Sequence, residues 1–120
     1  MNPSEIGVKF TIPLVPPNVN NYVRHTRWGG HYLTKEAIAF KEAVALCARR
    51  QYVAAKKYEI SLMIWLGKKQ RGDVDNFPKL VLDGLVAAGV IHSDAAVYRL
   101  LVEKGRDIKN PRTEITVRAM

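Results

Sequence analysis

Four of the five aspartates of this chain lie between Asp73 and Asp94, directly after the basic run at 68–71. Asp73 and Asp75 are two residues apart, and positions i and i+2 of an extended segment project to the same side. Two carboxylates on one side repel each other unless a cation lies between them or water screens them. Mg²⁺ prefers hard oxygen ligands and takes only a few from protein, so Asp94 could supply the third. The window predicts a metal site, with a solvated turn before a helix as the alternative.

A lysine and a fourth aspartate extend this pattern along the chain. Lys79 follows Asp75 by four residues and Asp83 follows Lys79 by four, so a helix would place them on one face. A lysine beside a carboxylate cluster can stabilise the charge that develops on a phosphate under attack, and metal-bound water can supply the nucleophile. Asp83 could pair with Lys79 and hold it in place. Alternatively, both residues could belong to an ordinary solvated helix face.

The periodicity of apolar residues predicts the elements that must position these side chains. Alternation favours strands, and recurrence every three to four residues favours helices. We expect strands at 8–12, 58–66, 97–103 and 113–118, a turn-rich loop at 18–30, and helices at about 35–52 and between Asn76 and Gly89. Thr34 is the expected N-cap of the first helix, and Asp75 or Asn76 that of the second. The order β-α-β-α-β-β indicates an α+β fold, a single small domain over residues 1–120 with two helices packed on a mixed sheet.

The charge of the chain is unevenly distributed. The formal net charge is +8, and up to Gly72 there are twelve Lys and Arg residues against four acidic ones. A basic surface concentrates polyanions, of which nucleic acid is the commonest, although many basic proteins bind nothing acidic. The single cysteine, Cys47, excludes an internal disulfide and suits a reducing cytoplasm. We expect no membrane segment, because no apolar run approaches about 18 residues.

Candidate DNA contacts fall into a stronger and a weaker group. Lys68, Lys69 and Arg71 flank the aspartate window and are expected to contact phosphate. Weaker candidates come from the predicted loop, whose charges could equally be solvated: Asn18, Asn20, Asn21, Arg24, His25 and Arg27. Three histidines lack a convincing metal-ligand spacing: His25, His31 and His92. Trp28 and Tyr32 are expected to pack or anchor the loop rather than stack on bases.

The fixed spacing of these residues is similar to that of a known enzyme family. The chain reads D-x-D-N-x-x-K-x-x-x-D-x-L from Asp73 to Leu85, then Ala88-Gly89, then D-x-x-V from Asp94. This block resembles the RusA family of Holliday junction resolvases. The segment PPNVNNYVRH at 16–25 also resembles the loop that follows that family's first strand, so the resemblance spans nearly the whole chain.

Two departures from the family pattern lie at the edges of the block. Gly72 separates Arg71 from Asp73, whereas the family commonly has an arginine directly before its first aspartate. Ser93 precedes Asp94, where the family often has a pair of aspartates. The first departure affects one expected DNA contact, and the second leaves Asp94 alone to serve as the last carboxylate.

The resemblance implies a specific activity and a specific set of site residues. Members are small homodimeric α+β endonucleases, often encoded by phages or prophages, that cut four-way DNA junctions by symmetric paired nicks. They use Mg²⁺, for which Mn²⁺ may substitute, and the resemblance implies no organic cofactor and no membrane partner. Their catalytic carboxylates match Asp73, Asp75 and Asp94, and their essential lysine matches Lys79. Asn76 and Asp83 would then be supporting residues.

Other functions remain open from the sequence. The fold could carry a nuclease that acts on flaps or other branched DNA, or a junction-binding protein with a silent active site. A basic protein that binds RNA, or no nucleic acid at all, is a further alternative. The complete set of three aspartates and one lysine argues against a silent site, and the two-fold symmetry of a junction favours a dimer.

Overall fold

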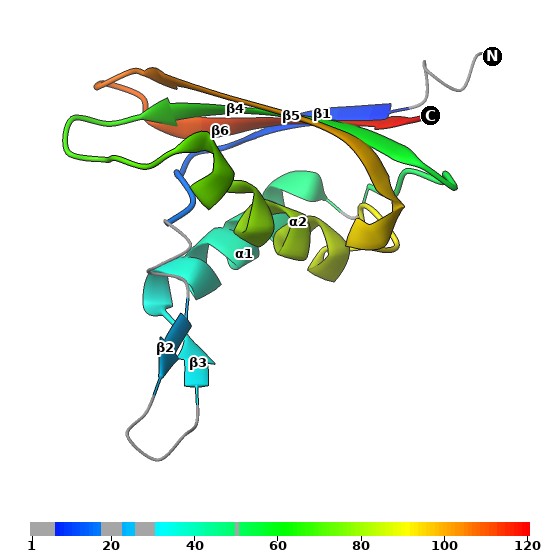
Figure 1. Cartoon of the computed structure of the whole chain (residues 1–120), viewed down its shortest axis with the longest axis horizontal. Helices are drawn as coiled ribbons and strands as arrows, with labels where there is room; N and C mark the ends of the chain where they lie inside the picture. Colours follow the sequence, from blue (N-terminus) through cyan, green and yellow to red (C-terminus); the bar gives the residue numbers. More distant parts are fainter. Residues whose placement is uncertain (1–6, 18–22, 26–30, 50) are drawn as a thin grey trace.

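The computed structural model describes residues 7–17, 23–25, 31–49 and 51–120 of the chain. Its strands are β1 (Gly7–Ile12), β2 (Val23–His25), β3 (His31–Leu33), β4 (Tyr58–Leu66), β5 (Val97–Arg106) and β6 (Arg112–Ala119). Its helices are α1 (Lys35–Ala48) and α2 (Pro78–Ala87), and two 3₁₀ turns are η3 (Val74–Asn76) and η4 (Asp94–Ala96) (Figure 1). The predicted α+β class and the order β-α-β-α-β-β are confirmed, with β2 and β3 as an additional pair.

The main sheet has four strands in the order β1-β6-β4-β5. β6 is antiparallel to both of its neighbours, whereas β5 is parallel to β4. Parallel strands need a crossover connection, and here α2 lies within it. Both helices lie on one side of the sheet (Figure 1). The aspartate window is therefore this crossover, with Asp73 and Asp75 before α2 and Asp94 after it.

The core lies between the helices and the sheet. Alternate residues of β4 are buried, from Tyr58 through Ile60 to Leu66, as the period of two predicts. Phe40 of α1 and Leu85 of α2 are buried in the same core. The two helices approach closely at Gly84, where an added Cβ would lie 3.3 Å from a methyl of Val44. This close approach brings α2, and with it the aspartate window, against the core.

Two helix boundaries differ from their predictions. Thr34 is confirmed as the N-cap of α1, because its Oγ1 accepts a hydrogen bond from the Ala37 N–H at 3.3 Å. The extension of α1 to residue 52 is wrong, since Arg49 adopts a left-handed conformation with φ of 50° and ends the helix. The capping of α2 by Asp75 or Asn76 is also wrong. Phe77 is the N-cap residue without a side-chain bond, and both polar residues lie in η3.

The prediction of a loop at 18–30 is wrong at β2, which pairs antiparallel with β3. The paired segments Val23–His25 and His31–Leu33 have three residues each, too few for an alternating pattern to be recognised. None of the helices in the described ranges is long and apolar enough to cross a membrane.

Candidate active site

The 3₁₀ turn η3 carries the first two predicted carboxylates. Asp73 is its N-cap residue, and the Asp73 carbonyl accepts a hydrogen bond from the Asn76 N–H at 2.9 Å. The Asp73 carboxylate makes no capping bond, and both it and the Asp75 side chain are exposed. Local structure is held by the backbone here, so the two carboxylates are left to face solvent. Carboxylates that face solvent in this way can serve as ligands for a cation or accept hydrogen bonds from water.

The basic loop between β4 and η3 is tied to β5 by two cationic side chains. The Arg106 guanidinium donates to the carbonyls of Gly67, Lys68 and Gln70. The Lys104 ammonium donates to the Gly72 carbonyl at 2.9 Å. These contacts fix the path of the backbone into η3, and η3 itself packs on β5. Neither Lys104 nor Arg106 could be predicted to reach this loop, because their positions late in β5 carry no such signal in the sequence.

The fifth aspartate of the chain, outside the window, has a structural role. Asp107 accepts hydrogen bonds from Arg112 Nη1 at 2.8 Å and from the Asn110 N–H at 3.2 Å. The hydrogen bond from Arg112 and that from the backbone of Asn110 lower the pKa of the Asp107 carboxyl below its usual value. Asp107 therefore stabilises the turn between β5 and β6. The carboxylates of Asp73 and Asp75 have no such partner within the described part of the chain.

The predicted pairing of Lys79 and Asp83 on one helix face is present. The Lys79 ammonium lies 3.3 Å from Asp83 Oδ1, one turn further along α2. The Lys79 side chain is 58% exposed and that of Asp83 is 23% exposed, so the pair lies at the surface with the lysine outermost. A pair this exposed adds little to stability. The contact orients the Lys79 side chain along the exposed face of α2 that it shares with Asp83.

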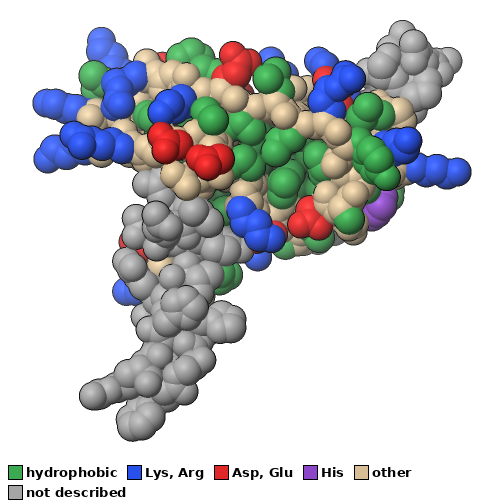
Figure 2. Space-filling model, in the orientation of Figure 1, with side chains coloured by type: hydrophobic (Ala, Val, Ile, Leu, Met, Phe, Trp, Pro, Cys, Tyr) green, Lys and Arg blue, Asp and Glu red, His purple; other side chains and the backbone are tan. Residues whose placement is uncertain are grey.

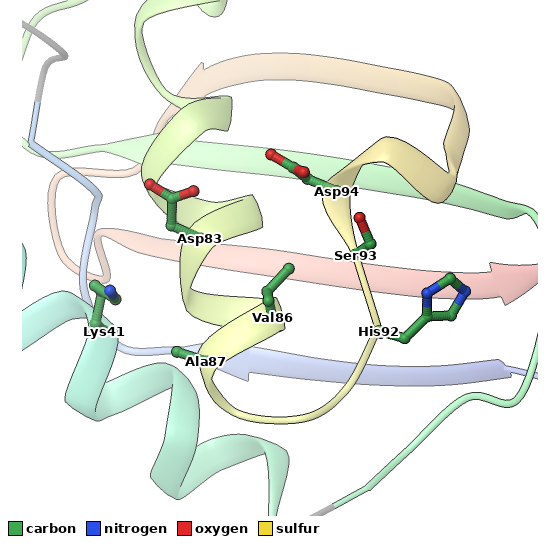
Figure 3. A pocket seen from close by; sticks show the side chains of 7 residues that line it. All are labelled: Lys41, Asp83, Val86, Ala87, His92, Ser93 and Asp94. Atoms are coloured by element: carbon green, nitrogen blue, oxygen red, sulfur yellow. The ribbon is translucent and has the colours of Figure 1, made fainter.

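Asp94 lines a hollow between the two helices and the segment 92–94 that leads toward β5 (Figure 3). The hollow has a volume of about 380 Å³, and its lining is Lys41, Asp83, Val86, Ala87, His92, Ser93 and Asp94. Ser93 accepts a hydrogen bond from the Ala95 N–H and caps η4, which leaves the exposed Asp94 carboxylate uncommitted to the cap. In Figure 3 this carboxylate points from η4 toward α2.

The structure brings the predicted site residues into two groups. Asp73 caps the turn η3 beside β5 and Asp75 lies within it, whereas Asp94 shares its hollow with Asp83 of the Lys79 pair. Among residues 7–17, 23–25, 31–49 and 51–120, no three His, Cys, Asp or Glu side chains lie close enough to hold a metal ion. The donor chemistry of three exposed carboxylates fits Mg²⁺ or Mn²⁺. The assembly of Asp73, Asp75 and Asp94 around one ion stays a prediction.

Lysine and arginine side chains gather at the end of the molecule where the β4–η3 loop and the β5–β6 turn lie (Figure 2). Lys68, Lys69 and Arg71 belong to this loop and are exposed. Acidic side chains lie directly beside this basic end in the same view. Four of the weaker candidates for DNA contact fall outside the described residues, namely Asn18, Asn20, Asn21 and Arg27, and the other two, Arg24 and His25, lie in β2.

Two residues at the hollow had no signal in the sequence. Lys41 lies on α1, more than thirty residues before the window, and only the packing of α1 on α2 brings it to the hollow. His92 was expected to be a surface histidine without a metal role. It is exposed, its Nε2 lies 3.1 Å from the Ala55 carbonyl, and its ring lies 5.5 Å from that of Tyr58.

Known proteins that are similar in sequence to this chain belong to one family of nucleases. The family model for endodeoxyribonuclease RusA matches residues 13–118. Relatives named crossover junction endodeoxyribonuclease RusA, from Escherichia coli K12 and from Enterobacteria phage 82, are each 31% identical over 92% of this chain and 93% of their own length. A Shigella sonnei relative of the same name is 30% identical over the same shares. The matched region contains the whole crossover and the strands that frame it, and the chain therefore belongs to the RusA family of endodeoxyribonucleases.

Proposed function

We propose that this protein is a Mg²⁺-dependent endodeoxyribonuclease that resolves four-way DNA junctions by paired symmetric nicks, in recombination and repair. Its family membership and the names of its relatives support this activity. The observation that carries the proposal most directly is the state of the aspartates. Asp73, Asp75 and Asp94 are exposed and uncommitted in a protein of net charge +8, whereas Asp107 is fully used in a turn. Exposed carboxylates could bind the metal ion that phosphodiester hydrolysis needs, and the basic loop beside them could bind the DNA backbone.

The chain's own residues have distinct tasks in this reaction. Asp73, Asp75 and Asp94 would hold the metal ion, which supplies an activated water and polarises the phosphoryl oxygens. Lys79 would place its ammonium beside the scissile phosphate and stabilise the negative charge that grows on it. Asp83 orients Lys79 through the 3.3 Å contact. Asn76 belongs to the turn η3, so its supporting role would be to set the path of the backbone between Asp75 and α2.

DNA would be held by the basic end of the molecule. Lys68, Lys69 and Arg71 are exposed on a loop whose backbone Arg106 and Lys104 fix. Such a loop can bind phosphates of the DNA backbone close to Asp73 and Asp75, whose carboxylates would otherwise repel the phosphates. These contacts would position the duplex without reading its sequence. Asn18, Arg24 and Arg27 would be further, weaker DNA contacts.

Three further properties complete the proposal. Paired nicks in a two-fold symmetric junction need two active sites, so the working protein would be a homodimer. A single cysteine and a DNA substrate suit work in the cytoplasm. The phage relative makes a phage or prophage setting one of the expected origins of the gene.

The decisive experiment compares a synthetic four-way junction with a linear duplex of the same sequence, with and without Mg²⁺. Wild-type protein should nick only the junction, symmetrically and only with metal. Asp75→Asn should lose cutting by about 10³-fold or more while it still binds the junction, because phosphate contacts and metal ligands are different residues.

Asp107→Asn is the matched control, since it makes the same substitution outside the window. It should cut like wild type at a temperature where it is folded. Tight junction binding without cutting in Mg²⁺ or Mn²⁺ would reject the nuclease and leave a junction-binding protein. Cutting of flaps in preference to four-way junctions would replace the proposed substrate by another branched DNA.

A further inference from the structure

Residues 51–57, in the connection between α1 and β4, are bonded to the segment that leads from α2 to Asp94. The Val53 N–H donates to the Val90 carbonyl at 2.9 Å, and the Val90 N–H donates to the Leu85 carbonyl of α2 at 2.9 Å. All three residues are buried. Residue 90 is therefore held on one side by α2 and on the other by the connection 51–57.

Tyr58, the first residue of β4, keeps this connection in place. Its side chain is fully buried, and its hydroxyl donates to the Val53 carbonyl at 2.7 Å. Val53 is thus bonded at both its N–H and its carbonyl, and breaking either bond would leave a buried backbone group without a partner, which costs free energy. The connection 51–57 can therefore act as a fixed support for the segment before Asp94.

His92 links the Asp94 segment to this support at the surface. Its Nε2 lies 3.1 Å from the Ala55 carbonyl, and a carbonyl can only accept, so Nε2 carries the hydrogen of this bond. The His92 ring also lies 5.5 Å from the Tyr58 ring at an angle of 51°, as in other tilted aromatic pairs. In Figure 3 the His92 ring and the Asp94 carboxylate point to opposite sides of the segment that carries them. The bond to Ala55 therefore holds this segment from the side away from α2.

The position of the Asp94 carboxylate depends on the backbone around it. Within the described part of the chain this carboxylate has no hydrogen-bond or ion-pair partner of its own. After it, Ser93 closes the turn η4, because its Oγ accepts from the Ala95 N–H at 3.1 Å and its carbonyl accepts from the Ala96 N–H at 3.2 Å. Before it, His92 is only two residues away, and two residues span at most about 7 Å. A shift of the backbone at His92 would therefore move Asp94.

We infer that His92 is a positioning residue for Asp94. Its hydrogen bond to the Ala55 carbonyl fixes the segment 92–94 and, with it, the carboxylate on the other side of that segment. The inference rests on the proposed function in one respect, namely that Asp94 is a metal ligand. Groups that hold a metal ligand in place contribute to metal affinity, and their loss lowers it by about 10- to 100-fold. Because His92 acts through two residues of backbone, its effect should lie at the lower end of this range or below it.

Amide hydrogen exchange without metal or DNA tests the positioning itself. The Ala95 and Ala96 N–H groups both bond to Ser93, so their exchange reports on the order of η4. His92→Ala should make them exchange at least about three-fold faster, because the segment 92–94 loses one of its anchors. His92→Gln should exchange like wild type, since a glutamine amide can donate to the same carbonyl. Unchanged exchange in His92→Ala, or equal acceleration in both variants, would overturn the inference.

Mn²⁺ binding tests the consequence for the site. The protein is titrated with Mn²⁺ in the presence of a nicking-resistant junction, and electron paramagnetic resonance measures the free ion. His92→Ala should raise the Kd by about three- to ten-fold, and His92→Gln should stay within about two-fold of wild type. Gln51→Ala is the control, because Gln51 is exposed on the same connection, and it should bind like wild type. At saturating Mg²⁺ the single-turnover cutting rate of His92→Ala should return to within about two-fold of wild type, which a loss of folded protein would not allow.

Asp94→Asn separates this inference from the proposed function. It should weaken Mn²⁺ binding more than His92→Ala does. Wild-type Mn²⁺ affinity in Asp94→Asn would reject the metal role of Asp94, whereas hydrogen exchange in η4 would still decide the positioning by His92. Wild-type affinity in His92→Ala beside weakened binding in Asp94→Asn would overturn the inference and leave the proposed function standing. Equal weakening by Gln51→Ala and His92→Ala would also overturn it. Circular dichroism must show that each variant is folded at the temperature of the titration.

Discussion

At the scale of single residues, the contrast between aspartates separates function from structure. The Asp107 carboxylate accepts hydrogen bonds from Arg112 and from the Asn110 N–H, which lower its pKa, and Asp83 contacts Lys79. Asp73 and Asp94 are exposed at the start of 3₁₀ turns whose capping bonds do not use their carboxylates. Residue spacing predicted the Lys79–Asp83 contact, because a helix fixes the distance between i and i+4. It failed for the capping of α2, because Asp75 and Asn76 lie inside the separate 3₁₀ turn η3 and Phe77 follows them before the helix begins.

The Lys79–Asp83 pair makes a graded prediction about activity. Lys79→Ala should lower junction cutting by about 10²-fold, because it removes the cation that faces the phosphate. Asp83→Asn should lower it less than about ten-fold, since the lysine remains and loses only its orienting partner. Both variants should unfold within about 1 kcal/mol of wild type, as expected for an exposed pair. The measurements are single-turnover cutting rates and urea unfolding. A larger loss of cutting in Asp83→Asn than in Lys79→Ala would contradict these roles.

At the scale of elements, the β4–α2–β5 crossover is the functional unit. The sequence predicted its two strands and its helix, because β4 alternates strictly and α2 has an apolar stripe. It could not predict that Lys104 and Arg106, at the far end of β5, hold the loop that leads into η3. Parallel pairing causes this, since it places the ends of β4 and β5 side by side. The pairing partner of a strand is a property of the whole sheet and is absent from local periodicity.

The tether from β5 to the basic loop can be tested by Arg106→Lys. The substitution keeps the positive charge but removes the planar guanidinium, which donates to three carbonyls of the loop. We expect cutting to fall by about three- to thirty-fold, while the salt dependence of junction binding stays that of wild type. Cutting rates and binding at several salt concentrations provide the measurement. A flatter salt dependence in Arg106→Lys would show instead that Arg106 contacts phosphate directly.

At the scale of the whole molecule, the three carboxylates are separated in the described structure and the protein is basic. The positive net charge would reduce repulsion among the three carboxylates, but it would also repel a divalent cation, and bringing the three groups together adds a further cost. The described residues hold no ready group of three ligands. Affinity for metal without DNA should accordingly be weak, and substrate phosphate would contribute to it.

Thermal unfolding tests this expectation. Millimolar Mg²⁺ or Mn²⁺ should raise the Tm of the wild type by mass action, with about 2.7 kcal/mol available at a concentration of 100 times the Kd. Asp75→Asn should show a smaller rise, and a nicking-resistant junction should increase the wild-type response. An equal rise in wild type and in a variant with all three aspartates replaced would place the metal elsewhere.

The position of β6 in the sheet has a consequence for how the chain folds during synthesis. β6 separates β1 from β4, yet it follows both of them in the sequence. While a ribosome is still making residues 112–119, β1 has no strand neighbour and β4 lacks one of its two. The apolar faces of these strands stay incompletely covered until β6 has left the exit tunnel. The sheet is therefore completed only after residues 112–119 have been translated. A nascent chain stalled before residue 112 should therefore bind chaperones that recognise exposed apolar strands.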